Sequence, residues 1–232
     1  MSAVTMIDYG IGNLLSVERA FRHLGADFKV AETAADIRMA DKLVLPGVGA
    51  FSSCIGTLEA QGLCDAVKEA AEQEKPLLGI CVGMQMLFDT SEEFGVHQGL
   101  GLLKGRVKAI PAVSAEGQSH KIPHIGWTSL ILPEGRKNWE QSLLRDVPVN
   151  AEVYFVHSYT AYPVDSGDRL ADAEYDGCLL SAMVNRGNVY GIQFHPEKSG
   201  TIGLKIHFHF VPHARLHEMI LQDFYSLLQR VL

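Results

Sequence analysis

The chain lacks the features that mark membrane, nucleic-acid-binding and secreted proteins. None of its apolar runs approaches the length needed to span a bilayer. The formal net charge is −7 without a long block of one sign, which argues against nucleic acid as the main partner. Residues 1–8 contain neither a basic region nor a long apolar core, so no signal peptide is expected. These features, with 47% hydrophobic and 20% charged residues, predict a soluble, cytoplasmic globular protein.

Cysteine is scarce, and no two cysteines form a Cys-x-x-Cys pair. The four cysteines are widely spaced, at Cys54, Cys64, Cys81 and Cys178. We therefore expect reduced thiols rather than a disulfide framework or a zinc site. The run Gly-Ile-Gly-Asn at 10–13 is too short and incomplete for a dinucleotide fingerprint, so neither a cofactor nor a metal is predicted.

Apolar runs of strand length alternate with helical patterns in the first part of the chain. Strands are predicted over 3–7, 27–31, 42–45 and 77–80, and helices over 14–24, 51–58 and 63–72. This alternation favours an α/β fold with a mostly parallel, open sheet flanked by helices.

Closely spaced turn residues mark the part of the chain that follows Gly99. Further strands, several of them antiparallel, are predicted over 107–110, 128–132, 152–155, 179–184 and 189–194. Gly187-Asn188 is predicted to be the turn of a hairpin between the last two. No linker interrupts the pattern, so residues 1–232 are expected to form a single domain.

Cys81 ends the predicted strand at 77–80 and is the strongest candidate for a reactive residue. A helical pattern begins near Met84, and a strand, tight turn and helix in this order place a nucleophile on an exposed elbow. Gly79 and Gly83 flank the cysteine, as expected where a Cβ atom would collide with a neighbouring strand or helix. The alternative is a buried structural cysteine, because free cysteine often packs as a small hydrophobe.

His195 and Glu197 follow a second apolar strand and provide a partner for this cysteine. They lie two residues apart on an extended stretch, so both side chains start on the same side of the chain. Glu197 can then hold one ring nitrogen of His195 while the other faces a thiol. A strand-end histidine is often only a polar cap, but its combination with an elbow cysteine predicts a catalytic triad of Cys81, His195 and Glu197.

The turn Pro46-Gly-Val-Gly49 also follows a predicted strand. Sites on open parallel sheets lie beyond the carboxyl ends of the strands. The backbone N–H groups of Gly49 and of Val82 are therefore candidates for an oxyanion hole. Taken alone, the segment is more typical of an ordinary strand-to-loop turn.

Two segments resemble the class I (triad) glutamine amidotransferases, a family with a flavodoxin-like fold. They are Gly79-Ile-Cys-Val-Gly-Met-Gln85 and Gln193-Phe-His-Pro-Glu197. Three more segments narrow the resemblance to the glutaminase subunits of imidazole glycerol phosphate synthases: Asp8-Tyr-Gly-Ile-Gly-Asn-Leu14, Pro123-His-Ile-Gly-Trp127 and Tyr154-Phe-Val-His-Ser-Tyr159.

The resemblance implies a glutaminase that works in a heterodimer. The chain would hydrolyse L-glutamine through a cysteine thioester and channel ammonia to a TIM-barrel cyclase subunit in L-histidine biosynthesis. The flexible Gly47-Val48-Gly49 turn would act as a switch that completes the oxyanion hole only with the partner bound. By similarity, the glutamine pocket would be lined by Gln85, Glu93, Ser158 and Tyr159, and the partner face would hold Asn13, Pro123, His124, Trp127 and Tyr154.

Other functions remain open at this stage. The chain could be the glutaminase of another class I amidotransferase, of the anthranilate or pyridoxal phosphate synthase type, although the three narrower segments count against this. A degenerate binding module of the same fold would be expected to lose a triad residue. A cysteine hydrolase of the DJ-1 type would share the elbow but not the His-Pro-Glu segment.

The C-terminal part departs from the family pattern. Removing residues 207–220 joins the start of the last helix to a good continuation, so this segment is predicted to be an insertion that breaks or displaces that helix. Pro212 supports a break, because proline does not fit a helix interior without a kink. The segment carries His207, His209, His213 and His217, but no carboxylate–histidine signature accompanies them and no metal is predicted.

Overall fold

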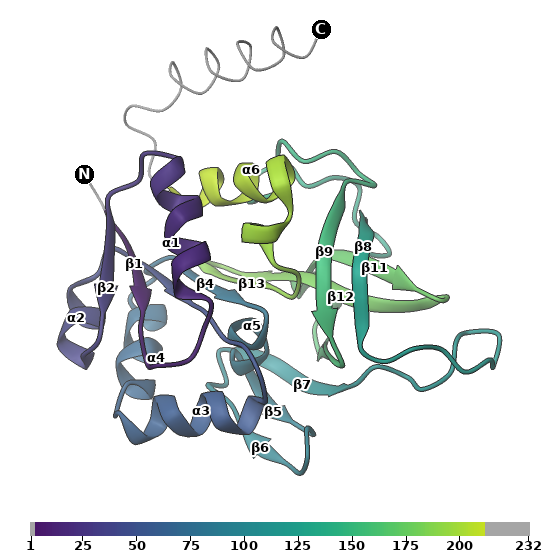
Figure 1. The fold of residues 1–232 in the computed structure, drawn as a ribbon, viewed down its shortest axis with the longest axis horizontal. Coiled ribbons are helices and arrows are strands. Elements are labelled where there is room, and N and C mark those ends of the chain that lie inside the picture. Colours follow the sequence, from purple (N-terminus) through teal and green to yellow (C-terminus); the bar gives the residue numbers. More distant parts are fainter. Residues whose placement is uncertain (1–2, 212–232) are drawn as a thin grey trace, which may run out of the picture.

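The centre of the molecule is a nine-stranded sheet, seen in a computed structural model that describes residues 3–211 (Figure 1). In spatial order its strands are β2 (Phe28–Ala31), β1 (Val4–Ile7), β3 (Lys42–Leu45), β4 (Leu77–Ile80), β13 (Val189–Ile192), β12 (Cys178–Arg186), β11 (Arg169–Tyr175), β8 (His124–Ile131) and β9 (Glu152–His157). The first five strands are parallel and the remaining neighbours are antiparallel. The predicted mostly parallel sheet with antiparallel strands in the second half is confirmed.

Helices cover both faces of the parallel part. On one face α1 (Leu14–His23) contacts α6 (Gly200–Phe210). On the other face lie α3 (Phe51–Ala60), α4 (Cys64–Glu72) and the short α5 (Val82–Met86), and α2 (Ala34–Met39) packs against α4. Strands buried between two helical layers carry continuous apolar runs, as in β4, where all four residues are buried.

A smaller, four-stranded sheet lies beside the main one. Its order is β10 (Tyr159–Pro163), β7 (Leu103–Ala109), β5 (Phe88–Ser91) and β6 (His97–Gln98). Two single turns of 3-10 helix, η1 (Ser166–Asp168) and η2 (Pro196–Lys198), complete the described elements. No helix within residues 3–211 has the length and apolar character required to cross a membrane.

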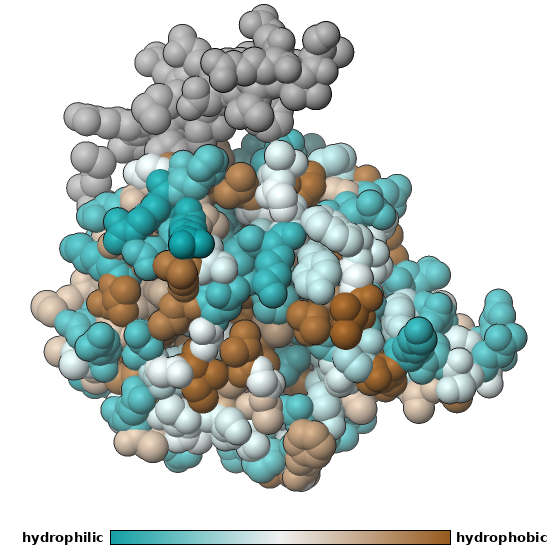
Figure 2. All heavy atoms as spheres, in the orientation of Figure 1, coloured by the Kyte–Doolittle hydropathy of each residue, from teal (hydrophilic) through white to brown (hydrophobic). Residues whose placement is uncertain are grey.

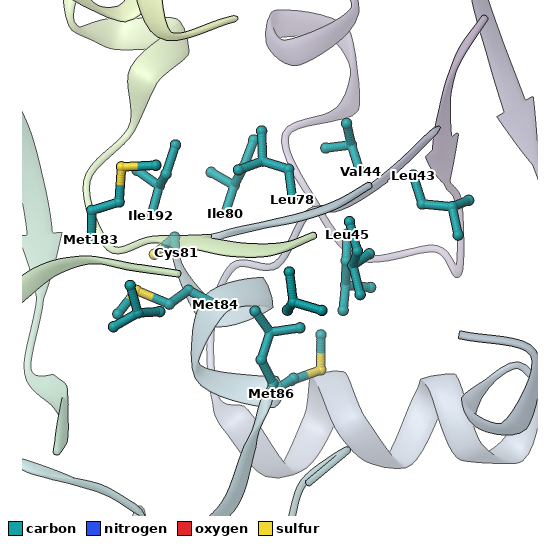
Figure 3. Close-up of a cluster of buried hydrophobic side chains, with 14 of the residues drawn as sticks. Leu43, Val44, Leu45, Leu78, Ile80, Cys81, Met84, Met86, Met183 and Ile192 are labelled. Atoms are coloured by element: carbon teal, nitrogen blue, oxygen red, sulfur yellow. The ribbon is translucent and has the colours of Figure 1, made fainter. Parts of the chain in front are cut away.

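The core packs closely around the junction of β3, β4 and α5. Figure 3 shows side chains from these elements and from β12 and β13 in one apolar cluster, with Cys81 close to Ile192 and Met84. A Cβ atom on Gly83 would lie 1.9 Å from the Leu45 carbonyl oxygen, and one on Gly79 would lie 2.6 Å from the Gly83 carbonyl oxygen. The glycines that flank Cys81 therefore permit direct backbone contact between strand and helix, as the sequence predicts.

Several element boundaries differ from those expected from the sequence: the strands predicted over 107–110 and 128–132, for example, are β7 and β8, which begin four residues earlier. The strand predicted over 189–194 ends at Ile192, because its parallel partner β4 ends at Ile80, the residue paired with Ile192. Helix α6 runs through Phe210, so the first four residues of the predicted insertion continue this helix. Val211 caps the helix, the residues of the segment from Pro212 onward lie outside the described residues, and the insertion stays a prediction.

Candidate active site

Cys81 lies on the turn between β4 and α5 in a conformation that side chains rarely adopt. Its φ is 55° and its ψ is −113°. The Cys81 N–H donates to the Ile192 carbonyl at 2.7 Å, and its own carbonyl accepts from the Gln85 N–H at 3.2 Å. Strained backbone of this kind persists only where surrounding contacts hold it, and it is concentrated at functional sites. The turn therefore has the strand–turn–helix geometry that the sequence predicts for an elbow, with Cys81 at the turn.

His195 lies just beyond β13, the strand next to β4 in the sheet. Its backbone N–H donates to the Tyr154 carbonyl at 2.9 Å, and its carbonyl accepts from the Ser199 hydroxyl at 2.7 Å. Its ring Nδ1 donates to Glu197 Oε1 at 2.8 Å. Glu197 thus fixes the tautomer of the imidazole and leaves Nε2 for another partner.

The environment of His195 favours its cation. Burial alone would lower the pKa of His195, but hydrogen bonds with Cys81 and Glu197 outweigh this penalty and raise the pKa to about 9. At neutral pH the site therefore holds a positive imidazolium between a sulfur and a carboxylate. This charge arrangement suits a cysteine nucleophile, because the attacking form is the thiolate.

The two N–H groups predicted to form an oxyanion hole are in different situations. The Val82 N–H donates to the Gly47 carbonyl at 3.3 Å, so its hydrogen is already used within the chain. Gly49 is exposed and has a φ of +87°, a conformation that suits glycine. The preceding carbonyl, of Val48, accepts from the Cys54 thiol at 3.3 Å.

The residues predicted to line a glutamine pocket lie around this elbow, with different partners. Gln85 is buried, and its Nε2 donates to the Tyr159 carbonyl at 3.2 Å. Ser158 and Tyr159, both partly buried, form the passage from β9 to β10. Glu93 is buried and accepts from the Phe51 N–H at 2.5 Å, which places its carboxylate at the N-terminus of α3.

The residues predicted for the partner face do not share one environment. Trp127 on β8 is 54% exposed, and its ring meets the edge of Tyr154 at a centroid distance of 6.0 Å. Pro123 is exposed and Asn13 is partly buried at the start of α1. His124 is only 2% exposed and stacks on the rings of Phe155 and Tyr175. It therefore lies beneath this face rather than on it.

A shallow groove of about 440 Å³ runs along β8 beside these residues. Ile125 and Trp127 from β8 line it together with the acidic side chains of Glu152 and Glu174. On the face shown in Figure 2, apolar residues at the surface occur as patches between polar ones. A groove that combines aromatic and apolar side chains with acidic ones is suited to contact with another protein.

Several polar residues near Cys81 were not predicted individually from the sequence. Gln193 is fully buried, accepts from Gln85 Nε2 at 3.0 Å and directs its own Nε2 to Cys81 Sγ at 3.8 Å. The signal that could have found it is a polar side chain in an apolar run directly before His195. His157 and Cys54 give weaker signals, since each becomes informative only when its neighbours in space are known.

Metal ligands are not grouped anywhere within the described part of the chain. Of the four histidines in the predicted insertion, His207 and His209 are buried on α6, and His209 Nε2 lies 2.9 Å from Asp146. His213 and His217 lie outside the described residues.

Comparison with known proteins points to one family. The model of the family described as "Glutamine amidotransferase class-I" matches residues 5–213. The chain is 48% identical to imidazole glycerol phosphate synthase subunit HisH 1 of Legionella pneumophila (strain Lens), over 89% of this chain and 97% of that protein. It is 46% identical to the HisH subunit of Geobacillus sp. (strain WCH70), over 88% and 93% of the two chains.

Solved structures agree on the fold. A structure titled as a glutamine amidotransferase superposes with a TM-score of 0.66 at 20% identity, covering 90% of this chain and 97% of its own. PurLQS from Thermotoga maritima gives a TM-score of 0.63 at 19% identity, with 90% and 96% coverage.

Proposed function

The chain belongs to the class I glutamine amidotransferase family, and from this premise we propose that it is the glutaminase subunit of an imidazole glycerol phosphate synthase. It hydrolyses L-glutamine to glutamate and ammonia for L-histidine biosynthesis. The observation that carries the proposal is the hydrogen-bonded Glu197–His195 pair, which lies just beyond β13, the strand next to β4 and the Cys81 elbow.

The chemistry uses three side chains. The Cys81 thiolate attacks the side-chain amide carbon of glutamine and forms a tetrahedral intermediate. The protonated His195 donates its proton to the leaving nitrogen, which departs as ammonia and leaves a cysteine thioester. His195, now neutral, takes a proton from water, and the resulting attack releases glutamate. Glu197 holds the imidazole in place and stabilises its cation in both halves of the reaction.

The oxyanion of each intermediate requires backbone N–H donors near Gly49 and Val82. The Val82 N–H already donates to the Gly47 carbonyl, so the donor set is incomplete in this arrangement. Rotation of peptide planes in the Gly47–Gly49 turn frees the Val82 N–H and turns an N–H from this segment toward the substrate. The site is thus a switch whose closed form suppresses wasteful hydrolysis.

Gln85, Glu93, Ser158 and Tyr159 belong to the glutamine pocket. Gln85, Ser158 and Tyr159 contact the substrate, while the contact of Glu93 with α3 makes it a support for the switch segment. A TIM-barrel cyclase subunit binds over the face that includes Asn13, Pro123, Trp127 and Tyr154, with His124 beneath it, and receives the ammonia in a cytoplasmic heterodimer.

The test is a glutaminase assay of the chain alone and with its cyclase subunit and the nucleotide substrate of that subunit. We expect low activity alone, a large rise in the complex and none with Cys81→Ala. Cys64→Ala is a matched control, because this thiol lies at the start of α4, away from the elbow. Equal activity with and without the partner would contradict the switch, and activity in Cys81→Ala would contradict the nucleophile.

A further inference from the structure

A continuous chain of hydrogen bonds runs from the groove along β8 to the nucleophile. Its first members are two buried histidines that face each other in register, His124 on β8 and His157 on β9. His124 Nδ1 lies 3.1 Å from His157 Nε2, and His124 Nε2 lies 2.8 Å from the Thr128 hydroxyl. His157 Nδ1 lies 2.9 Å from the carbonyl oxygen of Tyr159.

Which group donates and which accepts in each of these hydrogen bonds follows from the last acceptor, the Tyr159 carbonyl. A backbone carbonyl only accepts, so His157 Nδ1 must carry the hydrogen and donate to Tyr159. His157 Nε2 must then accept from His124 Nδ1, and His124 Nε2 accepts from the hydroxyl of Thr128. Burial lowers the pKa of His157 to about 3 and that of His124 to about 4, so both rings are neutral at pH 7 and each keeps one tautomer.

The Tyr159 carbonyl also determines how the side-chain amides of Gln85 and Gln193 are oriented. Gln85 must donate to it through Nε2, and the second Nε2 hydrogen goes to Gln193 Oε1. Gln193 therefore turns its own Nε2 to the sulfur of Cys81. With both hydrogens of Gln85 used, its Oε1 is left to accept an N–H from a bound amide.

We propose that His157, held by His124, is a positioning residue for the glutaminase reaction. It fixes the Tyr159 carbonyl as the anchor that orients Gln85 and Gln193, so that the site offers an oxygen to the substrate amide and an N–H to the nucleophile. This inference rests on the proposed glutaminase function and explains why two neutral histidines are buried next to a cationic one.

Loss of the anchor has a specific consequence. Without His157 the passage from β9 to β10 loses one of the two donors that hold the Tyr159 carbonyl, and the Gln85 amide is free to rotate. A rotated Gln85 presents its NH2 group to the NH2 group of glutamine, where two donors face each other without an acceptor. Binding of the substrate amide suffers more than the chemical step.

The test compares two substitutions of one residue in the complex with the cyclase subunit. His157→Phe keeps an aromatic ring but donates nothing, and we expect kcat/KM for glutamine to fall about tenfold, mostly through KM. His157→Asn places a side-chain N–H near the position of Nδ1 and should recover most of this loss. Alkylation of Cys81 by iodoacetamide gives a second readout, which His157→Phe should alter because Gln193 contacts the sulfur.

Phe155→Leu is the matched control for packing, because Phe155 packs against both histidines without donating a hydrogen bond. The proposal is overturned if His157→Phe keeps the wild-type KM, if His157→Asn recovers nothing, or if Phe155→Leu raises KM equally. An inactive wild-type complex would contradict the proposed function instead, so the two failures are distinguishable.

Discussion

Cys54 is a residue whose contact points to control of the reaction rather than to the reaction itself. It is fully buried on α3, and its thiol donates to the carbonyl of Val48 in the switch segment. Directly before this segment, the Pro46 carbonyl accepts from the Tyr9 hydroxyl at 2.8 Å. We expect these two bonds to restrain the segment in the form in which the Gly47 carbonyl accepts from the Val82 N–H.

Cys54→Ala should therefore raise the glutaminase activity of the isolated chain. Removal of the thiol releases the Val48 carbonyl, which lowers the free energy needed to reach the open form by about 1 kcal/mol and increases the basal rate by about fivefold. Glutamate release by the chain without its partner measures the effect. Cys64→Ala should leave the basal rate unchanged, and a Cys54→Ala variant with the wild-type basal rate would show that the thiol does not restrain the segment.

The sequence indicates the three proposed catalytic residues more clearly than the residues that support them. Cys81, His195 and Glu197 stand out because strand, turn and small residues surround them in a local pattern. Gln193 and His157 depend on partners far away in the sequence, such as Gln85 and His124. Strand order and register determine which buried polar groups contact each other, and neither can be predicted from a short segment of sequence.

At the scale of elements, the close backbone contact between β3, β4 and α5 depends on glycines, which have no side chain at the points of contact. Gly83→Ala would place a Cβ 1.9 Å from the Leu45 carbonyl oxygen, in backbone that has no room to move. We expect a loss of more than about 3 kcal/mol in the free energy of unfolding, measured by urea denaturation.

Gly56→Ala is the control for this substitution. Gly56 lies within α3, and no neighbouring element lies within 4 Å of the position that an added methyl group would take. Alanine should therefore stabilise the helix by about 0.5 to 1 kcal/mol. If both variants unfold at the same urea concentration, the close backbone contact is not a determinant of stability.

A buried histidine on helix α6 is expected to lower the stability of the protein at acidic pH. His207 is fully buried, stacks on Phe21 at 4.4 Å, and neither ring nitrogen has a hydrogen-bond partner within residues 3–211. Burial lowers the pKa of His207 from 6.5 to about 4. As pH falls through this interval the unfolded chain binds the proton first, so stability is complete above about 6.5 and is lost progressively toward 4.

Between about pH 7.5 and about pH 5, the free energy of unfolding of His207→Leu should fall by about 1 to 2 kcal/mol less than that of the wild type. Buried His124 and His157 lose stability in the same direction, so part of the acid sensitivity remains. Urea unfolding at the two pH values measures the difference. His23→Leu, at an exposed position in α1, should show the wild-type loss; an unchanged pH dependence in His207→Leu would mean that His207 is not buried as described.

The elements themselves were predictable where their signals are long and apolar. The four parallel strands β1 to β4 and the helices α1, α3 and α4 lie close to their predicted ranges. Strand β6 has two residues, and β5 reads Phe-Asp-Thr-Ser, so neither carries an apolar run. The six-residue helix α2 owes its start to a capping box between Thr33 and Asp36, a contact too short in sequence to stand out.

At the scale of the whole molecule, we expect the exposed Trp127 to be the main anchor of the proposed interface with the cyclase subunit. Its ring is half exposed and is supported by Tyr154, and large aromatic side chains contribute strongly when they become buried at an interface. Trp127→Ala should weaken the complex about 30-fold or more in Kd, as measured by calorimetric titration. Met39→Ala removes a side chain that is 75% exposed on α2 and should leave Kd unchanged; equal Kd values for both variants would remove Trp127 from the interface.

The order of the sheet is the part of the fold that the sequence does not contain in local form. The hairpin of β12 and β13 is predicted by its turn, and Arg186 pairs with Val189 as expected. Nothing near residue 189 indicates that β13 will insert beside β4. That pairing follows from burial of both strands between the helical layers, a property of the whole chain.

The position of β13 also decides when the protein can become active during its synthesis. A ribosome delivers Cys81 early, while β13, His195 and Glu197 emerge only near the end of the domain. Until β13 has joined the sheet next to β4 and residues 193–197 have followed it, Cys81 lacks its proposed base and its turn lacks the hydrogen bond to Ile192. We therefore expect unfinished or prematurely terminated chains to consume no glutamine, so that the order of synthesis would limit the release of free ammonia.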